Sequence, residues 1–289
     1  MTKVTPQNTS FGFNNGTSNK TASSGILSLP TEKSKIENDF LRFSYFIHGL
    51  QKIGKTTFTA QFPDAIHLMF EPGAKTEEIY QVAPKNWREV EQYITLLRSP
   101  EGERFKTVII DTVDLMFDMC SKAVCDEAGV EMLKDIGFGD GYKMVGNKFR
   151  NALIKIHDVK GLVMLAHSKD KMKTNDSDPD MVIPSTMKTG AEVIEKWADL
   201  TGHYYIKSNG KRFLKIRPST TMTAGTRIKK HFEYTDGNFV HDIPMGGNEE
   251  EAFANFIKAF NNELENPKAP KKSFGFNKPK EEKNENKEQ

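Results

Sequence analysis

Residues 43–57 read Phe-Ser-Tyr-Phe-Ile-His-Gly-Leu-Gln-Lys-Ile-Gly-Lys-Thr-Thr. The first six residues suit a buried strand, and Gly49 to Thr56 spell G-x-x-x-x-G-K-T. In such a loop between a strand and a helix, backbone N–H groups converge on phosphate oxygens, the lysine reaches the outer phosphates, and the threonine hydroxyl ligates Mg²⁺. The sequence therefore predicts a nucleotide site formed by Gly49, Leu50, Gln51, Lys52, Ile53, Gly54, Lys55, Thr56 and Thr57.

Composition indicates one globular domain. The chain has 289 residues, of which 37% are hydrophobic and 28% charged, which suits one large core rather than two. No apolar run approaches the roughly 18 residues of a membrane span, and the N-terminus lacks the apolar core of a signal peptide. We therefore expect a cytoplasmic protein with no membrane contact. Cys120 and Cys125 suggest neither a disulfide framework nor a metal-binding pair.

Both ends of the chain are predicted to be disordered tails, at 1–35 and 266–289, around a domain at 36–265. Each tail holds one copy of Ser-Phe-Gly-Phe-Asn, which includes Phe11-Gly12-Phe13 and Phe274-Gly275-Phe276. These copies could dock another subunit or a single-strand-binding or replication protein, or could stack on bases. Coincidence in a biased sequence is the alternative.

Hydrophobic periodicity predicts strands that alternate with helices. The expected strands are 42–48, 65–70, 108–110, 162–166, 202–206, 212–217 and 227–234. The expected helices run from the glycine loop to just before Pro63, then 86–98, 113–128, 141–158, 185–200 and 249–264, with a mobile loop at 168–183. This order predicts an α/β fold: a mainly parallel twisted sheet with helices on both faces and a C-terminal β-hairpin region.

The glycine loop or a polar residue directly follows several of these strands. The glycine loop, Glu71, Asp111 and His167 each come just after an apolar strand. Because ligands of parallel sheets bind beyond the carboxyl ends of the strands, we expect these residues to converge on one crevice.

Each of these residues has a functional and a structural interpretation. Asp111 would hold Mg²⁺ together with Thr56, or would simply cap the next helix, with Asp114 as the alternative metal ligand. Glu71 would deprotonate the attacking water, or would be a solvated carboxylate in a turn. His167 would contact the outermost phosphate, or would be an imidazole satisfied within the fold.

The order of motifs resembles bacteriophage RecA-like AAA-domain P-loop ATPases, including the Sak-type single-strand annealing proteins. The matching segments are the glycine loop, Phe-Glu-Pro-Gly at Phe70, Val-Ile-Ile-Asp at Val108, Gly-Phe-Gly-Asp-Gly-Tyr at Gly137 and Met-Leu-Ala-His-Ser-Lys at Met164. The resemblance covers roughly residues 40 to 235. It implies a Mg²⁺-dependent ATPase that converts ATP and water to ADP and phosphate in the host cytoplasm.

The resemblance also implies roles for individual residues. Glu71 would be the catalytic base and His167 the γ-phosphate sensor, although RecA recombinases usually carry glutamine at the sensor position. The loop 168–183 would face DNA. Arg227 and Lys229 lie where related ATPases supply a positive charge to a neighbour's nucleotide, which implies a homo-oligomer.

Basic residues concentrate between 200 and 232, which hold eight Lys or Arg and no Asp or Glu. Those on the predicted hairpin would track a phosphate backbone, or would solubilise an exposed sheet edge. They are Lys207, Lys211, Arg212, Lys215 and Arg217.

Three functions therefore stay open. The first is an ATPase that acts on single-stranded DNA in phage recombination, annealing or replication. The second is an ATPase that loads or remodels a replication protein without a direct DNA role. The third is a small-molecule phosphotransferase. The loop 168–183 lacks an evident pair of acceptor-binding arginines, which counts against this third function.

Overall fold

A computed structural model describes residues 29–75, 77–171 and 181–267. The chain divides into two units, Met1–Asn38 and Asp39–Gln289. In the first unit, residues 29–38 are exposed and form no helix or strand. Both Ser-Phe-Gly-Phe-Asn copies and the centre of the predicted loop 168–183 lie outside the described residues.

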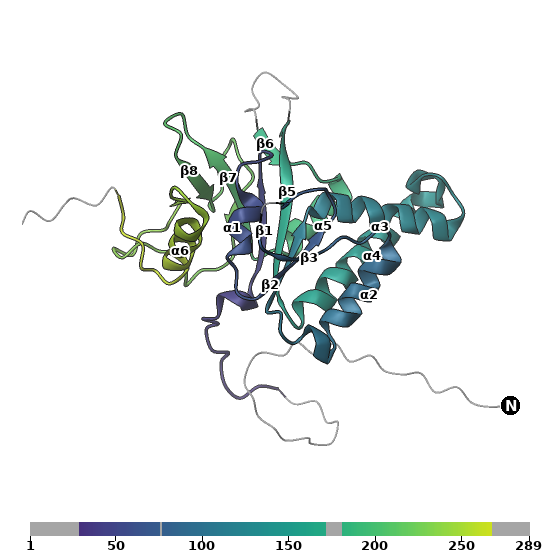
Figure 1. Ribbon diagram of the computed structural model, residues 1–289, viewed down its shortest axis with the longest axis horizontal. Coiled ribbons are helices and arrows are strands. Elements are labelled where there is room, and N and C mark those ends of the chain that lie inside the picture. The colour runs from purple at the N-terminus through teal and green to yellow at the C-terminus, as the bar shows by residue number, and fades with distance from the viewer. Residues whose placement is uncertain (1–28, 76, 172–180, 268–289) are drawn as a thin grey trace, which may run out of the picture. The chain divides into compact units, whose positions relative to one another are not determined.

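The second unit contains strands and helices in alternation (Figure 1). Its strands are β1 (Ser44–Gly49), β2 (Ala65–Met69), β3 (Tyr80–Val82), β4 (Thr107–Asp111), β5 (Gly161–Lys171), β6 (Met181–Pro184), β7 (Leu200–Ile206), β8 (Arg212–Lys215), β9 (Gly225–Thr226) and β10 (Asp242–Pro244). Its helices are α1 (Lys55–Ala60), α2 (Trp87–Leu97), α3 (Val113–Ala128), α4 (Asp140–His157), α5 (Lys188–Trp197) and α6 (Glu249–Phe260). Among the described residues, no helix is long and apolar enough to cross a membrane.

The strands form one sheet in the order β10-β8-β7-β1-β5-β4-β2-β3. From β7 to β3, every neighbouring pair on this path is parallel. β8 and β10 extend the sheet antiparallel beyond β7, and β6 and β9 pair antiparallel with β5 and β7. The predicted α/β fold with a mainly parallel sheet is thus confirmed.

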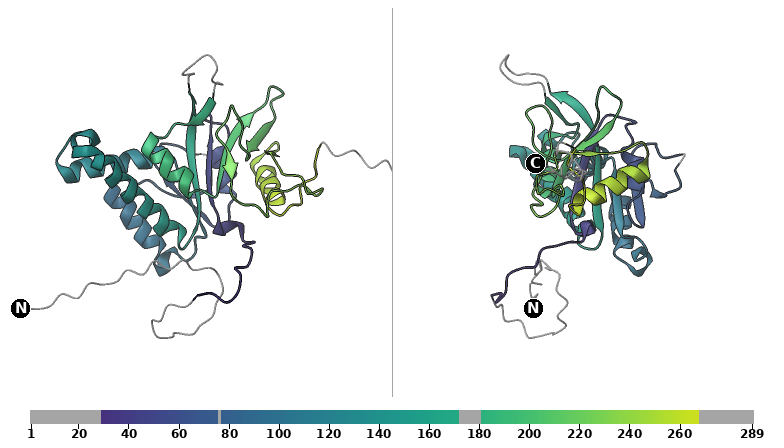
Figure 2. Two further views of the ribbon diagram at one scale, coloured as in Figure 1. Left: turned by 180° about the vertical axis from the view of Figure 1, so that it is seen from behind. Right: turned by 90° about the vertical axis from the view of Figure 1, so that its left-hand side faces the viewer.

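Helices cover both faces of this sheet because apolar residues alternate between the faces along the strands. In β1, Phe46 packs into a core with residues of α2, α3, α4 and α5. Tyr45 and Ile47 point to the other face, where they pack with residues of α1 and α6. Figure 2 shows these layers from behind and from the side.

The predicted loop at 168–183 was wrong at both ends. β5 continues to Lys171 and pairs with β6, with Ser168 opposite Pro184. The extension of β5 beyond His167 is polar and partly exposed, so its sequence carries no apolar alternation from which a strand could be predicted. The carboxyl end of β5 therefore continues into an antiparallel pair with β6.

The predicted strand at 227–234 was also wrong. Pairing with β7 comes from the short strand β9 just before it, and Glu233 makes only an isolated bridge to Phe239. Two short strands, β3 and β10, were not predicted. Each is three residues long, too short for a periodic pattern.

One buried residue is poorly matched to its surroundings. His67 of β2 is fully buried opposite Ile109 of β4, and neither ring nitrogen has a hydrogen-bond partner among the described residues. A buried polar group without a partner costs free energy, whereas an apolar side chain of similar size does not.

Replacing His67 by leucine is therefore expected to raise the free energy of unfolding by about 1 kcal/mol at neutral pH. Urea unfolding followed by circular dichroism measures the change, with the exposed His241→Gln as the control. A loss of stability in His67→Leu would mean that the imidazole has a partner, such as a buried water.

Candidate functional site

The glycine loop joins β1 to α1, and its two glycines are required for different reasons. Gly54 has φ +105, in the left-handed region that favours glycine. At Gly49 a Cβ atom would lie 2.4 Å from the carbonyl oxygen of Tyr204 in β7. Gly54 therefore permits the turn into α1, and Gly49 permits the close approach of β7.

Lys55 lies under the loop. Its Nζ donates to the carbonyl oxygens of Gly49 at 3.1 Å and Leu50 at 2.8 Å, and the residue is 6% exposed. Burial lowers the pKa of Lys55, while the nearby carboxylates of Asp111 and Glu71 act to raise it. The ammonium group is thus enclosed by the loop on one side and faces acids on the other.

Thr56 and Asp111 are in direct contact. The Thr56 hydroxyl donates to Oδ2 of Asp111 at 2.7 Å, and Asp111 is 3% exposed at the end of β4. Burial raises the pKa of Asp111, and the hydrogen bond from Thr56 opposes that shift. A hydroxyl and a carboxylate at one point are oxygen donors of the kind that Mg²⁺ takes, so the pair fits this ion.

Glu71 and His167 form the second contact at this edge. His167 Nε2 lies 3.1 Å from Oε2 of Glu71, so Nε2–H donates to the carboxylate. Strand order places the other residues beside this contact: β5 pairs His167 with Gly49, and β4, which ends at Asp111, lies between β5 and β2, which ends just before Glu71. The structure therefore brings the glycine loop, Glu71, Asp111 and His167 to one edge of the sheet.

Asp114 points elsewhere. One of its oxygens, Oδ2, accepts from the Ser185 hydroxyl at 3.0 Å, and the Ser185 backbone N–H donates to the carbonyl of His167 at 2.8 Å. This geometry favours Asp111 over Asp114 as the partner of Thr56.

Sequence reasoning missed two residues beside the site. Ser185 joins α3 to β5, and a Cβ built at Gly54 would lie 3.8 Å from the Tyr204 hydroxyl. Both residues reach the site through contacts between distant segments of the chain, and neither lies in a recognisable motif. The signal available for Tyr204 was its position in the expected strand 202–206.

The basic hairpin residues divide into two groups. Lys215 Nζ lies 3.3 Å from Asp242, and the Arg217 guanidinium lies 4.4 Å from the Phe239 ring centroid. Lys207 lies over Phe213 at 3.8 Å. The remaining two have no such fold-internal contact among the described residues; they are Lys211, which is exposed, and Arg212, which is half-buried.

Arg227 lies at the opposite edge of the sheet from the glycine loop. Its Nη2 donates to the carbonyl of Lys196 at 2.7 Å, and its Nε lies 3.8 Å from Asp199. Asp199 in turn accepts from Ser44, the first residue of β1. Lys229 is exposed nearby in the chain. Arg227 therefore lies away from the glycine loop of its own chain, and the role of Arg227 and Lys229 toward a neighbour stays a prediction.

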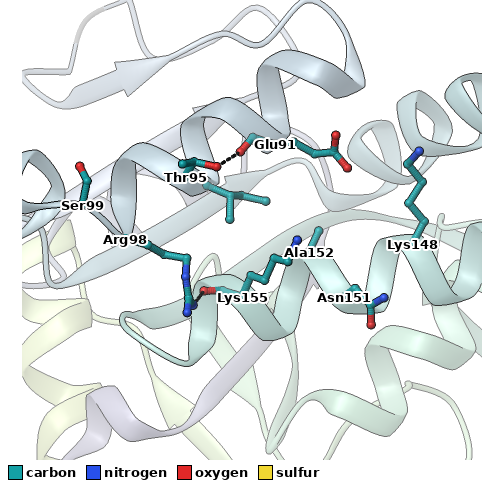
Figure 3. A pocket seen from close by; sticks show the side chains of 9 residues that line it. Glu91, Thr95, Arg98, Ser99, Lys148, Asn151, Ala152 and Lys155 are labelled. Carbon is teal, nitrogen blue, oxygen red and sulfur yellow. Dashed lines mark hydrogen bonds between the residues drawn. The ribbon is translucent and has the colours of Figure 1, made fainter. Parts of the chain in front are cut away.

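A separate groove of about 710 Å³ lies between α2 and α4 (Figure 3). Its lining includes the buried residues Ile94 and Ala152 and charged side chains of both signs, among them Glu91 and Lys155. Arg98 spans it to donate to the backbone carbonyl of Lys155. None of the predicted site residues lines this groove.

The chain is similar in sequence to known proteins. A family described as an AAA domain matches residues 42–228, which contain the whole site. The SPbeta prophage-derived uncharacterized protein YorG of Bacillus subtilis (strain 168) is 28% identical over 200 residues, which are 66% of this chain and 59% of that protein. The matched region thus spans less than two thirds of the length of this relative. Since the family match extends over more than half of the chain, from β1 through β9, the protein belongs to the AAA domain family.

Proposed function

We propose that the protein is a Mg²⁺-dependent, RecA-like ATPase of the Sak type that acts on single-stranded DNA in recombination, annealing or replication. The observation that carries the ATPase part is the meeting of Lys55, the Thr56–Asp111 pair and the Glu71–His167 pair at one sheet edge. A phosphate cradle, an oxygen pair for the metal and a carboxylate for a water are the parts that ATP hydrolysis requires.

The residues of the loop would perform the binding. Lys55 exchanges its two loop carbonyls for phosphate oxygens, and the N–H groups from Gly49 to Thr57 surround the same phosphates. Thr56 and Asp111 hold Mg²⁺, which when bound neutralises charge on the phosphates. Asp111 acts in its ionised form.

Glu71 would take the proton of the attacking water, and His167 would control it. The His167 Nε2–H that donates to Glu71 could instead donate to a phosphate oxygen. Moving this donor to a phosphate releases a lone pair of Glu71 for the water. His167 therefore links phosphate binding to activation of the base.

The DNA part depends on the hairpin of β7 and β8 and on the family resemblance. Lys211 and Arg212 are the cations left for a phosphate backbone once the internal contacts of Lys207, Lys215 and Arg217 are counted. Arg227 and Lys229 would serve a neighbouring subunit's nucleotide in a homo-oligomer. The tail motifs around Phe11 and Phe274 would dock a partner.

The internal contacts of these basic residues also favour a second candidate, an ATPase that loads or remodels a replication protein. Three of the five predicted DNA-binding cations are held against Phe213, Asp242 and Phe239, which reduces the charge available for DNA. In this case ATP hydrolysis would respond to a protein and not to DNA.

The deciding experiment measures ATP hydrolysis with and without single-stranded DNA. The wild-type protein is expected to hydrolyse ATP faster with DNA than without it. The Lys55→Ala variant is expected to hydrolyse no ATP in either condition, because its contact with the phosphates is gone. Hydrolysis without stimulation, together with no DNA binding at low salt, would favour the remodeller. No hydrolysis under any condition would refute the ATPase proposal.

A further inference from the structure

A cluster of buried polar side chains lies on the sheet face opposite α1, directly behind the glycine loop. Its centre is His48, which is fully buried and immediately precedes Gly49. His48 Nδ1 lies 2.8 Å from the Ser168 hydroxyl, and Nε2 lies 2.7 Å from the carbonyl oxygen of Thr223. Both nitrogens are therefore in use, and both partners come from other segments of the chain.

These contacts fix the tautomer of His48. The Thr223 carbonyl can only accept, so Nε2 carries the proton and Nδ1 accepts from the Ser168 hydroxyl. His203 Nδ1 lies 3.4 Å from the same His48 Nδ1, so the two rings are in contact. A neutral imidazole with a donor and an acceptor side cannot rotate without losing both bonds.

The two bonds of His48 close a ring of segments. Ser168 belongs to β5 and directly follows His167, whereas Thr223 pairs with β6 through its N–H to the Val182 carbonyl at 3.0 Å. β6 pairs back onto β5. His48 thus ties the residue before the glycine loop to the residue after His167, to β6 and to the segment 221–223.

The cluster continues toward the basic hairpin. His203 stacks on Tyr205, with ring centroids 5.7 Å apart and planes 10° apart. The Tyr205 hydroxyl donates to Asp242, the same carboxylate that binds Lys215. This row of polar contacts runs from the buried His48 and His203 to the half-buried Tyr205 and Asp242, so it connects the end of β1 to β8 and β10.

We infer that His48 is a positioning residue that transmits the state of the glycine loop to β6 and to the segment 221–223. The Gly49 carbonyl, one peptide from His48, holds Lys55. When Lys55 moves to a phosphate, the end of β1 loses that bond and reorients, and the doubly bound imidazole carries the displacement to Ser168 and Thr223. This inference rests on the proposed nucleotide binding.

The test is hydrogen–deuterium exchange of the full-length chain with and without ADP and Mg²⁺. Wild-type peptides that cover β5, β6 and 219–226 are expected to change their exchange rate at least about fivefold on nucleotide binding. His48→Phe should abolish this nucleotide-dependent difference while binding ADP within about twofold of wild type. His48→Gln, which keeps one donor and one acceptor, should retain part of it.

A purely structural role would alter exchange equally with and without nucleotide, so the difference is the informative quantity. His67→Leu is the matched control, because it removes another buried strand histidine whose ring nitrogens have no hydrogen-bond partner in the described part of the chain. If His48→Phe does not fold, Ser168→Ala decides, since it deletes one hydroxyl at a partly exposed position.

Two negative results have different meanings. If wild type binds ADP but β6 and 221–223 do not respond, or still respond in both His48→Phe and Ser168→Ala, the role of His48 is refuted and the ATPase proposal stands. If wild type binds neither ADP nor ATP, the proposed function fails, and the inference about His48 fails with it.

Discussion

Replacing Glu71 by glutamine is expected to lower the rate of ATP hydrolysis about 10²–10⁴-fold and to leave ATP binding intact. Glutamine keeps the shape of the side chain and can still accept the His167 Nε2–H bond, but its amide cannot take a proton from water. Single-turnover hydrolysis measures the chemical step, and equilibrium titration with a fluorescent ATP analogue measures binding.

The matched control is Glu78→Gln, an exposed acid in the segment that follows Glu71. It removes the same charge close by in the chain and should hydrolyse ATP at the wild-type rate. Hydrolysis by Glu71→Gln within threefold of wild type would remove Glu71 from the role of base. The His167–Glu71 contact would then be a structural bond only.

The sequence predicted the central strands and the meeting of polar residues at one edge of the sheet, because apolar runs and the polar residues that end them coincide there. Buried parallel strands are continuous apolar runs, and the polar residue that ends each run marks the carboxyl edge. Asp111 and His167 could be placed on one edge from this rule alone, without knowledge of which strands are neighbours. The contact of Thr56 with Asp111 bears out that placement.

Other features could not be predicted, because they depend on pairing between distant segments. The stem of β5 and β6 is made by backbone hydrogen bonds between polar residues, which leave no pattern in the sequence. Lys215 and Arg217 look like free cations in the sequence, but Asp242 and Phe239 reach them from another part of the chain. His48 is one polar residue within an apolar run, and its partners lie 120 and 175 residues away.

Mild acid is expected to destabilise the protein before its carboxylates titrate. Burial lowers the pKa of His48 to about 3 and the pKa values of His67 and His203 to about 4, from 6.5 in the unfolded chain. Between these values the unfolded state binds more protons than the folded state, so stability falls as pH falls below 6.5. At pH 5.5 each histidine costs about 1.4 kcal/mol, and the three together about 4 kcal/mol.

Urea unfolding at pH 7.5 and at pH 5.5 tests this loss of stability, because the two pH values lie on either side of the histidine pKa of the unfolded chain. Burial also raises the pKa of Asp111, a shift that acts in the opposite direction, because the folded state then binds this proton more readily than the unfolded state as pH falls. His67→Leu should remove about 1.4 kcal/mol of the loss between the two pH values, since it deletes one of the buried neutral imidazoles. The exposed His241→Gln should leave the loss unchanged. Equal stability of the wild type at both pH values would mean that the buried histidines already carry protons in the folded state, contrary to the acceptor role of His48 Nδ1.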